Sequence, residues 1–260
     1  MDARQKDATD TACPPLISII TVTYNAAENL AHTLQSVAGQ TFPHYEHIIM
    51  DGASTDDTPE VVARCQNPNI RFISAADKGI YDAMNKGLAE ATGDYVVFIN
   101  AGDTFHSNKT LSEVAELIMD NDFPGVVYGQ TDLVDKNRKR VGGRHLTAPD
   151  QLTYHSFADG MLVCHQAFIA LRRIAGDYDT RYRFSADYDW CIRILQHSRH
   201  NILFPDVMVD YLNEGATTRN HGKSLCERFR IMSYYYGFIP TCLRHFKFLW
   251  RAIRRPYVKS

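Results

Sequence analysis

The sequence predicts an α/β fold with a doubly wound, mostly parallel central sheet. Three observations predict it: β-branched runs of the kind that form buried parallel strands, helical patterns between those runs, and short connections. The chain has 260 residues, of which 45% are hydrophobic and 22% charged. That length and composition suffice for one domain with a sizeable core, or for one domain and an appendage.

The first half alternates strand and helix. Residues 16–24 form a near-continuous β-branched run, which predicts a strand buried on both faces. A helical pattern follows at 25–39, with Leu30, Leu34 and Val37 at helical spacing. By the same criteria we expect further strands at 44–50, 70–73, 94–99 and 126–128, and further helices at 58–65, 79–91 and 110–119.

The second half and the two ends are less regular. We expect helices at 184–196 and 225–236, strands at 201–204 and 208–211, and a tail at 246–255 in which aromatic and basic residues recur at roughly helical spacing. Residues 1–14 read as a disordered leader and 223–260 as a helical extension. The total charge is −2, yet six Lys or Arg and no acid follow from Arg244 onward.

Several function classes are disfavoured. The balanced charge does not indicate a nucleic-acid partner. The six cysteines are scattered without a zinc-type spacing, residues 1–11 contain no apolar signal-peptide core, and no apolar run approaches the roughly 18–20 residues of a membrane span. We therefore expect a cytoplasmic protein. No dinucleotide-binding glycine motif and no P-loop is present.

Candidate ligand contacts follow the ends of four predicted strands. Ligands of open α/β sheets bind at the carboxyl ends of the strands. Here those ends carry the segments 23–25, 51–56, 77–79 and 100–103, and three of the four place an acid or amide beside a small residue. One such segment alone is most simply a turn or a helix cap, but four on one sheet edge predict a binding site.

These segments resemble the bacterial family 2 glycosyltransferases, most closely those that build exopolysaccharide and capsule. The resemblance rests on ISIITVTYN (17–25), IIMDGASTDDT (48–58), DKGIYDAMNKG (77–87) and GDYVVFINAGD (93–103), which stand in the family's order. It implies a GT-A fold, a three-layer α/β/α sandwich with a catalytic domain at 15–222. Within that domain, 15–105 would bind the nucleotide sugar and 106–222 the acceptor.

The resemblance also assigns donor contacts. Positions that match the family's nucleobase and ribose pocket are Thr21, Tyr24, Asn25 and Glu28, with Asp51 accepting a bond from the base and Ser54 shaping its loop. Positions that would face the ribose, diphosphate or donor sugar are Asp77, Lys78, Asn85 and Lys86. A solvated helix lysine is the alternative for Lys86.

A divalent cation, Mn²⁺ or Mg²⁺, is implied as cofactor. Asp103 ends the family's D-x-D-type motif and would be the metal ligand, although a cap for the following segment is the alternative role. Asn100 replaces the first acid of that motif. Because an amide supplies no negative charge, metal affinity would depend largely on the nucleotide, and Asn100 would orient the ribose or a metal-bound water.

Asp187 is the candidate catalytic base. The family usually has Glu-Asp where this chain has Ala186-Asp187. On a helix from Phe184, Asp187 shares the apolar face with Trp190, whereas Asp189 falls on a polar face where a solvated ion pair is expected. His165 and Gln166 match acceptor-side motifs and would lie near the acceptor or the diphosphate, with a structural role as the alternative for His165. The loop 213–218 and Arg219 or His221 resemble, more weakly, a segment that closes over the donor.

The resulting hypothesis is an inverting hexosyltransferase that extends a glycan or a lipid-linked oligosaccharide acceptor in polysaccharide or capsule biosynthesis. Two alternatives stay open: a sugar-phosphate nucleotidyltransferase, and a sugar-nucleotide-binding protein without catalysis. The missing basic glycine-rich loop argues against the first, and retention of Asp103 and Asp187 against the second. The aromatic and basic tail predicts peripheral contact with the inner face of an anionic membrane, and packing of a C-terminal helix on the domain is its alternative.

Overall fold

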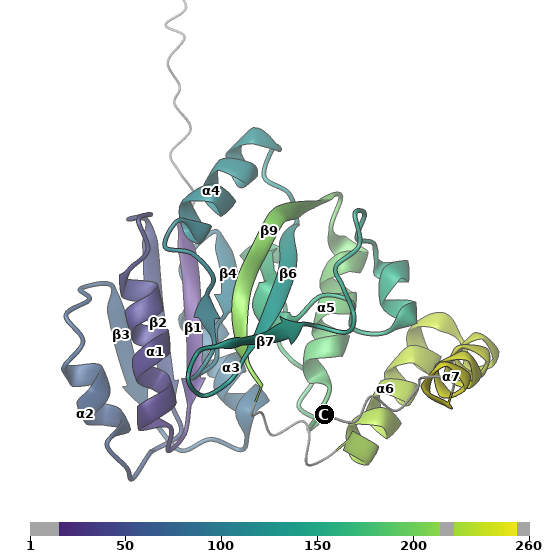
Figure 1. Cartoon of the computed structure of the whole chain (residues 1–260), viewed down its shortest axis with the longest axis horizontal. Helices are drawn as coiled ribbons and strands as arrows, with labels where there is room; N and C mark the ends of the chain where they lie inside the picture. Colours follow the sequence, from purple (N-terminus) through teal and green to yellow (C-terminus); the bar gives the residue numbers. More distant parts are fainter. Residues whose placement is uncertain (1–15, 214–220, 254–260) are drawn as a thin grey trace, which may run out of the picture.

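The computed structural model describes residues 16–213 and 221–253, apart from the side chains at 221 and 247–253. The predicted leader, the donor-closing loop from residue 214 to Arg219 and the end of the tail lie outside the described residues. Figure 1 shows a sheet flanked by helices, with two further helices at the C-terminal end. The strands are β1 (Ile17–Thr23), β2 (Tyr45–Asp51), β3 (Ile70–Ser74), β4 (Tyr95–Phe98), β5 (Thr104–Phe105), β6 (Val126–Val134), β7 (Arg140–Gly143), β8 (Phe168–Leu171) and β9 (Asn201–Leu212).

The helices complete the alternation. They are α1 (Ala27–Ala38), α2 (Thr58–Ala63), α3 (Ile80–Glu90), α4 (Thr110–Asp120), α5 (Ala186–His197), α6 (His221–Tyr236) and α7 (Phe238–Ile253). Short 3-10 turns occur at Tyr154–Asp159, His165–Ala167 and Arg172–Ile174. Each predicted strand and helix of the first half is present, with its ends shifted by a few residues.

The strand order is β3-β2-β1-β4-β8-β6-β9-β5, with β7 paired to β6. β1, β2, β3 and β4 pair in parallel, and β6 pairs in parallel with β9. Because β8 is antiparallel to both β4 and β6, the strands β4 and β6 point the same way. Among the described strands only β5, β7 and β8 run in the opposite direction, so the sheet is mostly parallel.

Helices cover both faces of the sheet and make three layers. Side chains of α3 and α5 form one buried cluster with Ile20 and Phe98 of the sheet. Neighbouring residues of the same strands, such as Ile19 and Val97, face the other way and pack with α1 and α4, and α2 packs beside α1. Residues that alternate along a strand point to opposite faces, so both faces of β1 and β4 are buried, as their β-branched sequences predict.

The second half contains strands that the sequence analysis did not predict. β8 is four residues long and lies between β4 and β6, and nothing in its sequence indicates that it inserts there. The strand expected at 126–128 continues to Val134, and the two strands expected at 201–204 and 208–211 are one strand, β9, with register shifts against β6. Pro205 lies between the two predicted segments, and an irregular pairing accommodates a residue that has no N–H to donate.

α6 and α7 form the C-terminal part of the described chain (Figure 1). Ile231 and Met232 of α6 are buried in the same cluster as α3 and α5. Along α7, Ile239, Leu243 and Phe246 are exposed. Among the described residues, no helix is both long and apolar enough to span a bilayer.

Candidate active site

The carboxyl ends of β1 and β2 are joined by hydrogen bonds between two loops. The backbone N–H of Asn25 donates to Ser54 Oγ at 2.8 Å, and Asn25 Oδ1 accepts from the N–H of Thr55 at 2.8 Å. Asp56 accepts from the N–H of Ala27 at 3.2 Å. Asn25, Glu28 and Asp56 line a hollow of about 470 Å³ at this edge. The structure thus brings together three of the predicted donor contacts: Asn25, Glu28 and Ser54.

Gly52 lets a third segment approach this edge. A Cβ at Gly52 would lie 2.7 Å from Asp77 Oδ2 and 3.2 Å from Tyr24 Cδ2. The side chains of Asp77 and Tyr24 therefore both lie close to the backbone of Gly52, which has no side chain. Tyr24 is 63% exposed, so its ring is free to stack on a planar ligand. Asp77 also accepts a bond from the N–H of Gly79 at 2.8 Å.

Two predicted contacts are turned inward. Thr21 is fully buried, donates its hydroxyl hydrogen to the carbonyl of Ile99 at 2.7 Å and lies 2.9 Å from His47 Nε2. The expectation that Thr21 lines the donor pocket is wrong, because this residue of β1 faces the interior. Asp51 is 1% exposed and accepts bonds from Ser54 and from the Ser74 hydroxyl at 2.6 Å. In this structure Asp51 organises the loop that bears Ser54.

On helix α3, two predicted donor contacts bind other parts of the chain: Lys86 binds the loop before Asp77, and Asn85 binds the acceptor half. Lys86 Nζ donates to the carbonyl of Ala76 at 2.9 Å and pairs with Asp82 at 3.0 Å, while its side chain is 38% exposed. Asn85 donates to the carbonyl of Tyr178 at 3.0 Å and accepts from its N–H at 2.7 Å. Its amide therefore faces the acceptor half rather than the donor hollow. Lys78 is exposed beside them.

A cavity of about 250 Å³ lies between the two halves of the sheet. Asn100, at the end of β4, lines it together with His165, Gln166 and Asp187. Four predicted site residues therefore meet in one cavity, although they are up to 87 positions apart in the chain.

Asp103 lies behind this cavity and is 4% exposed. Its Oδ1 accepts from the N–H of Leu212 at 3.0 Å, and its Oδ2 accepts from Gln166 Nε2 at 2.8 Å. Burial raises the pKa of Asp103 to about 7, although both hydrogen bonds favour the ionised form. A cation beside the carboxylate would favour ionisation further.

Asp103 and Asn100 each carry oxygen atoms of the type that binds a hard cation. Asn100 Oδ1 is buried and has no hydrogen-bond partner among the described residues. Mg²⁺ and Mn²⁺ prefer oxygen ligands, and each carboxylate oxygen of Asp103 retains a lone pair beyond the bond it accepts. The Asp103 carboxylate, which Gln166 fixes, and the unpaired amide oxygen of Asn100 are therefore both donors of the kind that such a cation prefers.

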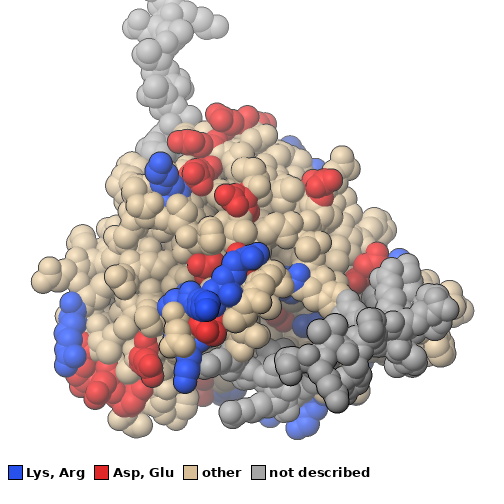
Figure 2. Space-filling view, viewed as in Figure 1, with Lys and Arg blue, Asp and Glu red and all other residues tan. Residues whose placement is uncertain are grey.

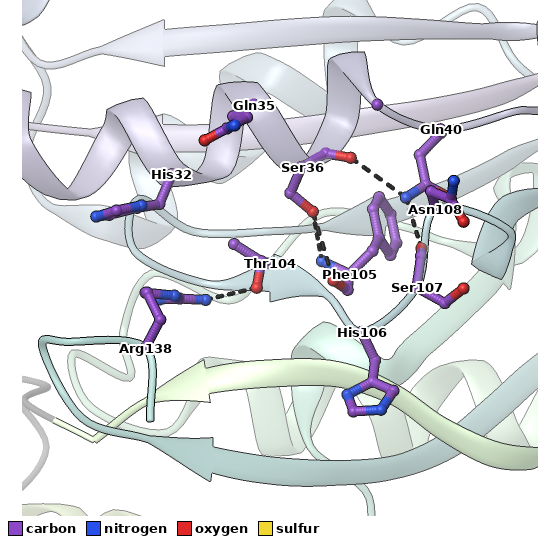
Figure 3. A pocket seen from close by; sticks show the side chains of 11 residues that line it. His32, Gln35, Ser36, Gln40, Thr104, Phe105, His106, Ser107, Asn108 and Arg138 are labelled. Carbon is purple, nitrogen blue, oxygen red and sulfur yellow. Dashed lines mark hydrogen bonds between the residues drawn. The ribbon is translucent and has the colours of Figure 1, made fainter. Parts of the chain in front are cut away.

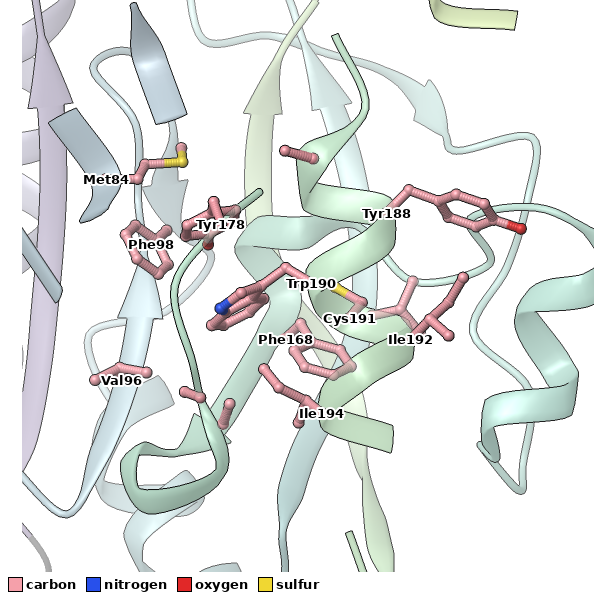
Figure 4. Close-up of a cluster of buried hydrophobic side chains, with 14 of the residues drawn as sticks. Met84, Val96, Phe98, Phe168, Tyr178, Tyr188, Trp190, Cys191, Ile192 and Ile194 are labelled. Atoms are coloured by element: carbon pink, nitrogen blue, oxygen red, sulfur yellow. The ribbon is translucent and has the colours of Figure 1, made fainter. Parts of the chain in front are cut away.

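His165 is held within an aromatic cluster. Its ring stacks on Phe98 with centroids 5.1 Å apart, and its Nε2 lies 2.5 Å from the hydroxyl of Tyr178. Figure 4 shows Phe98, Tyr178 and Trp190 of the same cluster. Burial lowers the pKa of His165 to about 4. His165 is therefore neutral at neutral pH and presents one edge to the cavity.

Asp187 and Asp189 point in different directions, as predicted. Asp189, however, is buried and not solvated. Asp187, in the first turn of α5, lines the cavity and accepts a bond from the Tyr81 hydroxyl at 3.0 Å. Asp189 does pair with Arg193, at 2.8 Å, but it is buried and also accepts a bond from Tyr235 at 2.9 Å. The expected solvated face is covered by α6, a contact between helices distant in sequence.

The fold and this arrangement can now be set beside known proteins. The glycosyl transferase family 2 model matches residues 18–177. The chain belongs to this family. It is 34% identical over 207 residues to a PGL/p-HBAD biosynthesis glycosyltransferase of Mycobacterium bovis, covering 77% of each chain. It is also 34% identical over 128 residues to an uncharacterized glycosyltransferase of Nostoc, covering 48% of this chain and 39% of that one.

Solved structures show the same fold. The S. aureus TarS fragment 1–349 superposes with a TM-score of 0.73 at 17% identity, covering 94% of this chain and 75% of that one. The mannosyltransferase PcManGT of Pyrobaculum calidifontis, solved with GDP-Man and Mn²⁺, superposes with a TM-score of 0.63 at 18% identity, covering 94% and 77%. The protein is thus a family 2 glycosyltransferase with a GT-A fold.

The cavity of this glycosyltransferase also contains Tyr81, Arg144 and Arg228, which were not predicted from sequence. Tyr81 stands inside the 77–87 segment, so a signal for it existed. Arg144 follows β7, and Arg228 lies on α6; no motif marks either. Arg144 donates to the carbonyls of Met161 and Leu162, and neither arginine pairs with a carboxylate among the described residues. The Nε of Arg228 is buried and has no hydrogen-bond partner there.

A second polar hollow of the glycosyltransferase, of about 310 Å³, lies between α1, β5 and the β6–β7 hairpin. Figure 3 shows His32, Gln35 and Ser36 on α1 opposite Thr104, with Arg138 bonded to the Thr104 hydroxyl. No Asp or Glu lines this hollow, so it offers no carboxylate that could serve as a base or a metal ligand.

One further cluster lies across the sheet from the cavity. His106, Asp132 and Asp210 bring their ligand atoms within 4.8 Å of one another. Because Leu133 and Tyr211 line the cavity, the neighbouring acids on β6 and β9 point to the opposite face. Asp210 pairs with His106 at 2.7 Å, and Asp132 pairs with Arg140. Lys and Arg gather over this hairpin (Figure 2), and each acid already has a basic partner.

Proposed function

We propose that the protein transfers a hexose from a nucleotide-diphosphate sugar to a hydroxyl of a lipid-linked glycan, with inversion at the anomeric carbon, in polysaccharide biosynthesis. The observation that carries the proposal is the meeting of Asp187 with Asn100 and Gln166 in one cavity, because Gln166 in turn holds Asp103. The cavity then holds a base for the acceptor together with the amide that orients the proposed metal ligand Asp103.

In this reaction the acceptor oxygen attacks the anomeric carbon directly. The bond from that carbon to the diphosphate oxygen breaks, the nucleoside diphosphate departs, and the hydroxyl proton passes to the carboxylate of Asp187. General-base assistance of this kind is worth about 10²–10⁴-fold in rate. Asp187 lies in the first turn of α5, where the helix dipole favours the ionised carboxylate.

The donor is assigned to the edge formed by residues 15–105. Tyr24, with Asn25 and Glu28, would hold the base and ribose, while Asp51 and Ser54 fix the loop beneath them. Asp77 and Lys78 would face the ribose and diphosphate. The guanidinium groups of Arg144 and Arg228, which lack carboxylate partners among the described residues, favour an anionic group in the cavity such as the diphosphate.

A divalent cation is assigned to Asp103 and Asn100. When bound, it neutralises charge that develops on the departing diphosphate. The chain's own part is to keep the Asp103 carboxylate oriented through Gln166 and the N–H of Leu212, and to exclude water from it by burial.

We further assign a membrane-proximal location at the cytoplasmic face. The exposed apolar residues Ile239, Leu243 and Phe246 are four and three positions apart on α7 and so share one helix face. The basic residues of the same tail suit anionic headgroups. Docking there would bring a lipid-linked acceptor to the acceptor half, and α6 connects that helix to the cavity through Arg228.

Incubation with a panel of UDP-, GDP- and dTDP-sugars, lipid-linked acceptors and Mn²⁺ tests the proposal. We expect one donor to give a glycosylated product whose anomeric configuration, read by NMR, is opposite to that of the donor. Asp187→Asn should lower turnover about 10²–10⁴-fold with donor affinity retained. Asp120→Asn, on the exposed end of α4, serves as the matched control. Product with retained configuration, or near-normal turnover in Asp187→Asn, would refute the mechanism.

A further inference from the structure

We propose that Tyr81 is a positioning residue for the catalytic base: its hydroxyl orients the Asp187 carboxylate from a helix of the donor half. The inference rests on the proposed function, in which Asp187 is that base. Neither the family resemblance nor the comparisons assign a role to Tyr81.

The contact joins two helices that are far apart in sequence. Tyr81 lies in the first turn of α3 and Asp187 in the first turn of α5, and the Tyr81 hydroxyl donates to Asp187 Oδ1 at 3.0 Å. Among the described residues no other group hydrogen-bonds this carboxylate. One oxygen is thus fixed by Tyr81, and the other is left to accept the acceptor's hydroxyl proton.

The Tyr81 ring is itself held by packing. It stacks on Tyr178 with centroids 5.6 Å apart and an interplanar angle of 24°, and Tyr178 stacks on Trp190 of α5 at 4.9 Å and 11°. Figure 4 shows Tyr178 and Trp190 beside the strand that carries Phe98. Asn85, one turn along α3 from Tyr81, fixes both backbone groups of Tyr178. A hydroxyl on a ring so constrained can set the direction of the carboxylate.

The surroundings keep this hydroxyl a donor. Burial, with the charge of Asp187 as the next cause, raises the pKa of Tyr81 well above its ordinary value, so its proton stays in place. The other titratable or charged groups around Asp187 act through space or line the same cavity; they are His165, Tyr178, Cys191, Tyr211, Arg144 and Arg228.

The contact also connects the base to the donor loop. α3 begins directly after the turn in which Asp77 accepts from the N–H of Gly79 and Asp82 accepts from the N–H of Lys78. A donor that binds Asp77 therefore contacts the turn that sets the start of Tyr81's helix. The orientation of the Asp187 carboxylate would then depend on whether the turn that carries Asp77 is held in place.

Tyr81→Phe tests the role, because it removes the hydroxyl and retains the ring that stacks on Tyr178. We expect kcat to fall about 10- to 100-fold, the range for a hydrogen bond to a charged group, while KM for donor and acceptor stays within about twofold. In the Asp187→Asn background the same change should have no further effect.

Tyr95→Phe is the matched control. It also removes a buried hydroxyl, which donates to the carbonyl of Pro124 at 2.7 Å, but it does so away from the cavity. If Tyr81→Phe keeps the wild-type kcat, or loses no more activity than Tyr95→Phe, the positioning role is wrong while the assignment of Asp187 stands. If Asp187→Asn itself retains turnover, the base assignment fails and the positioning role with it.

Discussion

At the scale of single residues, Gly52 is where the loops of the donor site come closest. A Cβ there would meet Asp77 Oδ2 at 2.7 Å and Tyr24 at 3.2 Å. Gly52→Ala should therefore separate these side chains and weaken nucleoside-diphosphate binding at least tenfold, since displacement by about 1 Å at a site can cost 10²-fold. Calorimetry with UDP and GDP measures the effect. Gly143→Ala, whose Cβ would be 3.9 Å from its nearest neighbour, should leave affinity unchanged; an equal affinity in Gly52→Ala would contradict the assignment.

His47 gives a pH dependence of stability. Thr21 donates its one hydroxyl hydrogen to Ile99, so His47 Nε2 is the donor to Thr21, and Nδ1 is buried without a partner among the described residues. Burial lowers the pKa of His47 from 6.5 to about 3. The folded state thus binds this proton less tightly than the unfolded state. The contribution to stability is complete above pH 6.5 and is lost as the pH falls toward 3.

We expect the free energy of unfolding to decrease from pH 7.5 to pH 5, with this residue contributing up to about 1.4 kcal/mol per pH unit. His47→Gln removes the titrating group while leaving other histidines in place, so it should flatten the curve. Urea denaturation at a series of pH values measures both slopes. Parallel curves for the two proteins would show that His47 does not contribute.

Residue roles were predictable from sequence only where they depend on neighbours along the chain. The face of α5 that carries Asp187 follows from helical spacing, and Asp187 does line the cavity. The burial of Asp189 depends on Tyr235, which is 46 positions away. The same limit explains Asn85, whose partners on Tyr178 are 93 positions away.

At the scale of elements, α6 is attached to the start of α5 by Glu227. Its carboxylate accepts the backbone N–H groups of Arg183 and Phe184 at 2.9 and 2.8 Å, just before the turn that presents Asp187. Glu227→Ala should leave both donors unpaired and lower the free energy of unfolding by about 1–3 kcal/mol. It should also lower kcat, because the start of α5 loses its support.

Chemical denaturation and steady-state kinetics check this prediction, with Glu116→Ala on the exposed face of α4 as the control. Equal stability of the two variants would show that the Glu227 bonds are replaced by water at no cost. Unchanged kcat with reduced stability would show that Glu227 stabilises the fold but does not help to position Asp187.

Elements were predicted best where strand and helix alternate. β1 and β4 are largely apolar runs, and each of the first four strands follows a helix or precedes one, so local pattern and topology agree. β8 has four residues and pairs antiparallel with β4 and β6, which are 70 and 40 or so positions away along the chain. The position of β8 is set by its pairing with these distant strands, and no local sequence pattern predicts such pairing.

At the scale of the whole molecule, the C-terminal helices extend the acceptor side of the domain. The ion pair of Arg244 with Asp159, at 3.7 Å, and the burial of Ile231 and Met232 hold this region against the domain. The division at residue 222 and the membrane contact stay predictions. Packing on the domain and docking on a membrane are compatible, because the packed and exposed sides of α7 are different faces.

The membrane contact predicts that the intact protein floats with vesicles containing anionic lipid and not with neutral vesicles. Leu243 and Phe246 are 65% and 70% exposed, so Leu243→Ser with Phe246→Ser should abolish flotation without unfolding the domain. Each basic residue near the surface adds about 1 kcal/mol, and recovery should therefore fall as salt rises and the Debye length shortens. Met119→Ser on α4, another exposed apolar side chain, should float as the wild type does. Equal recovery of the double variant would mean that this face of α7 does not contact the lipid.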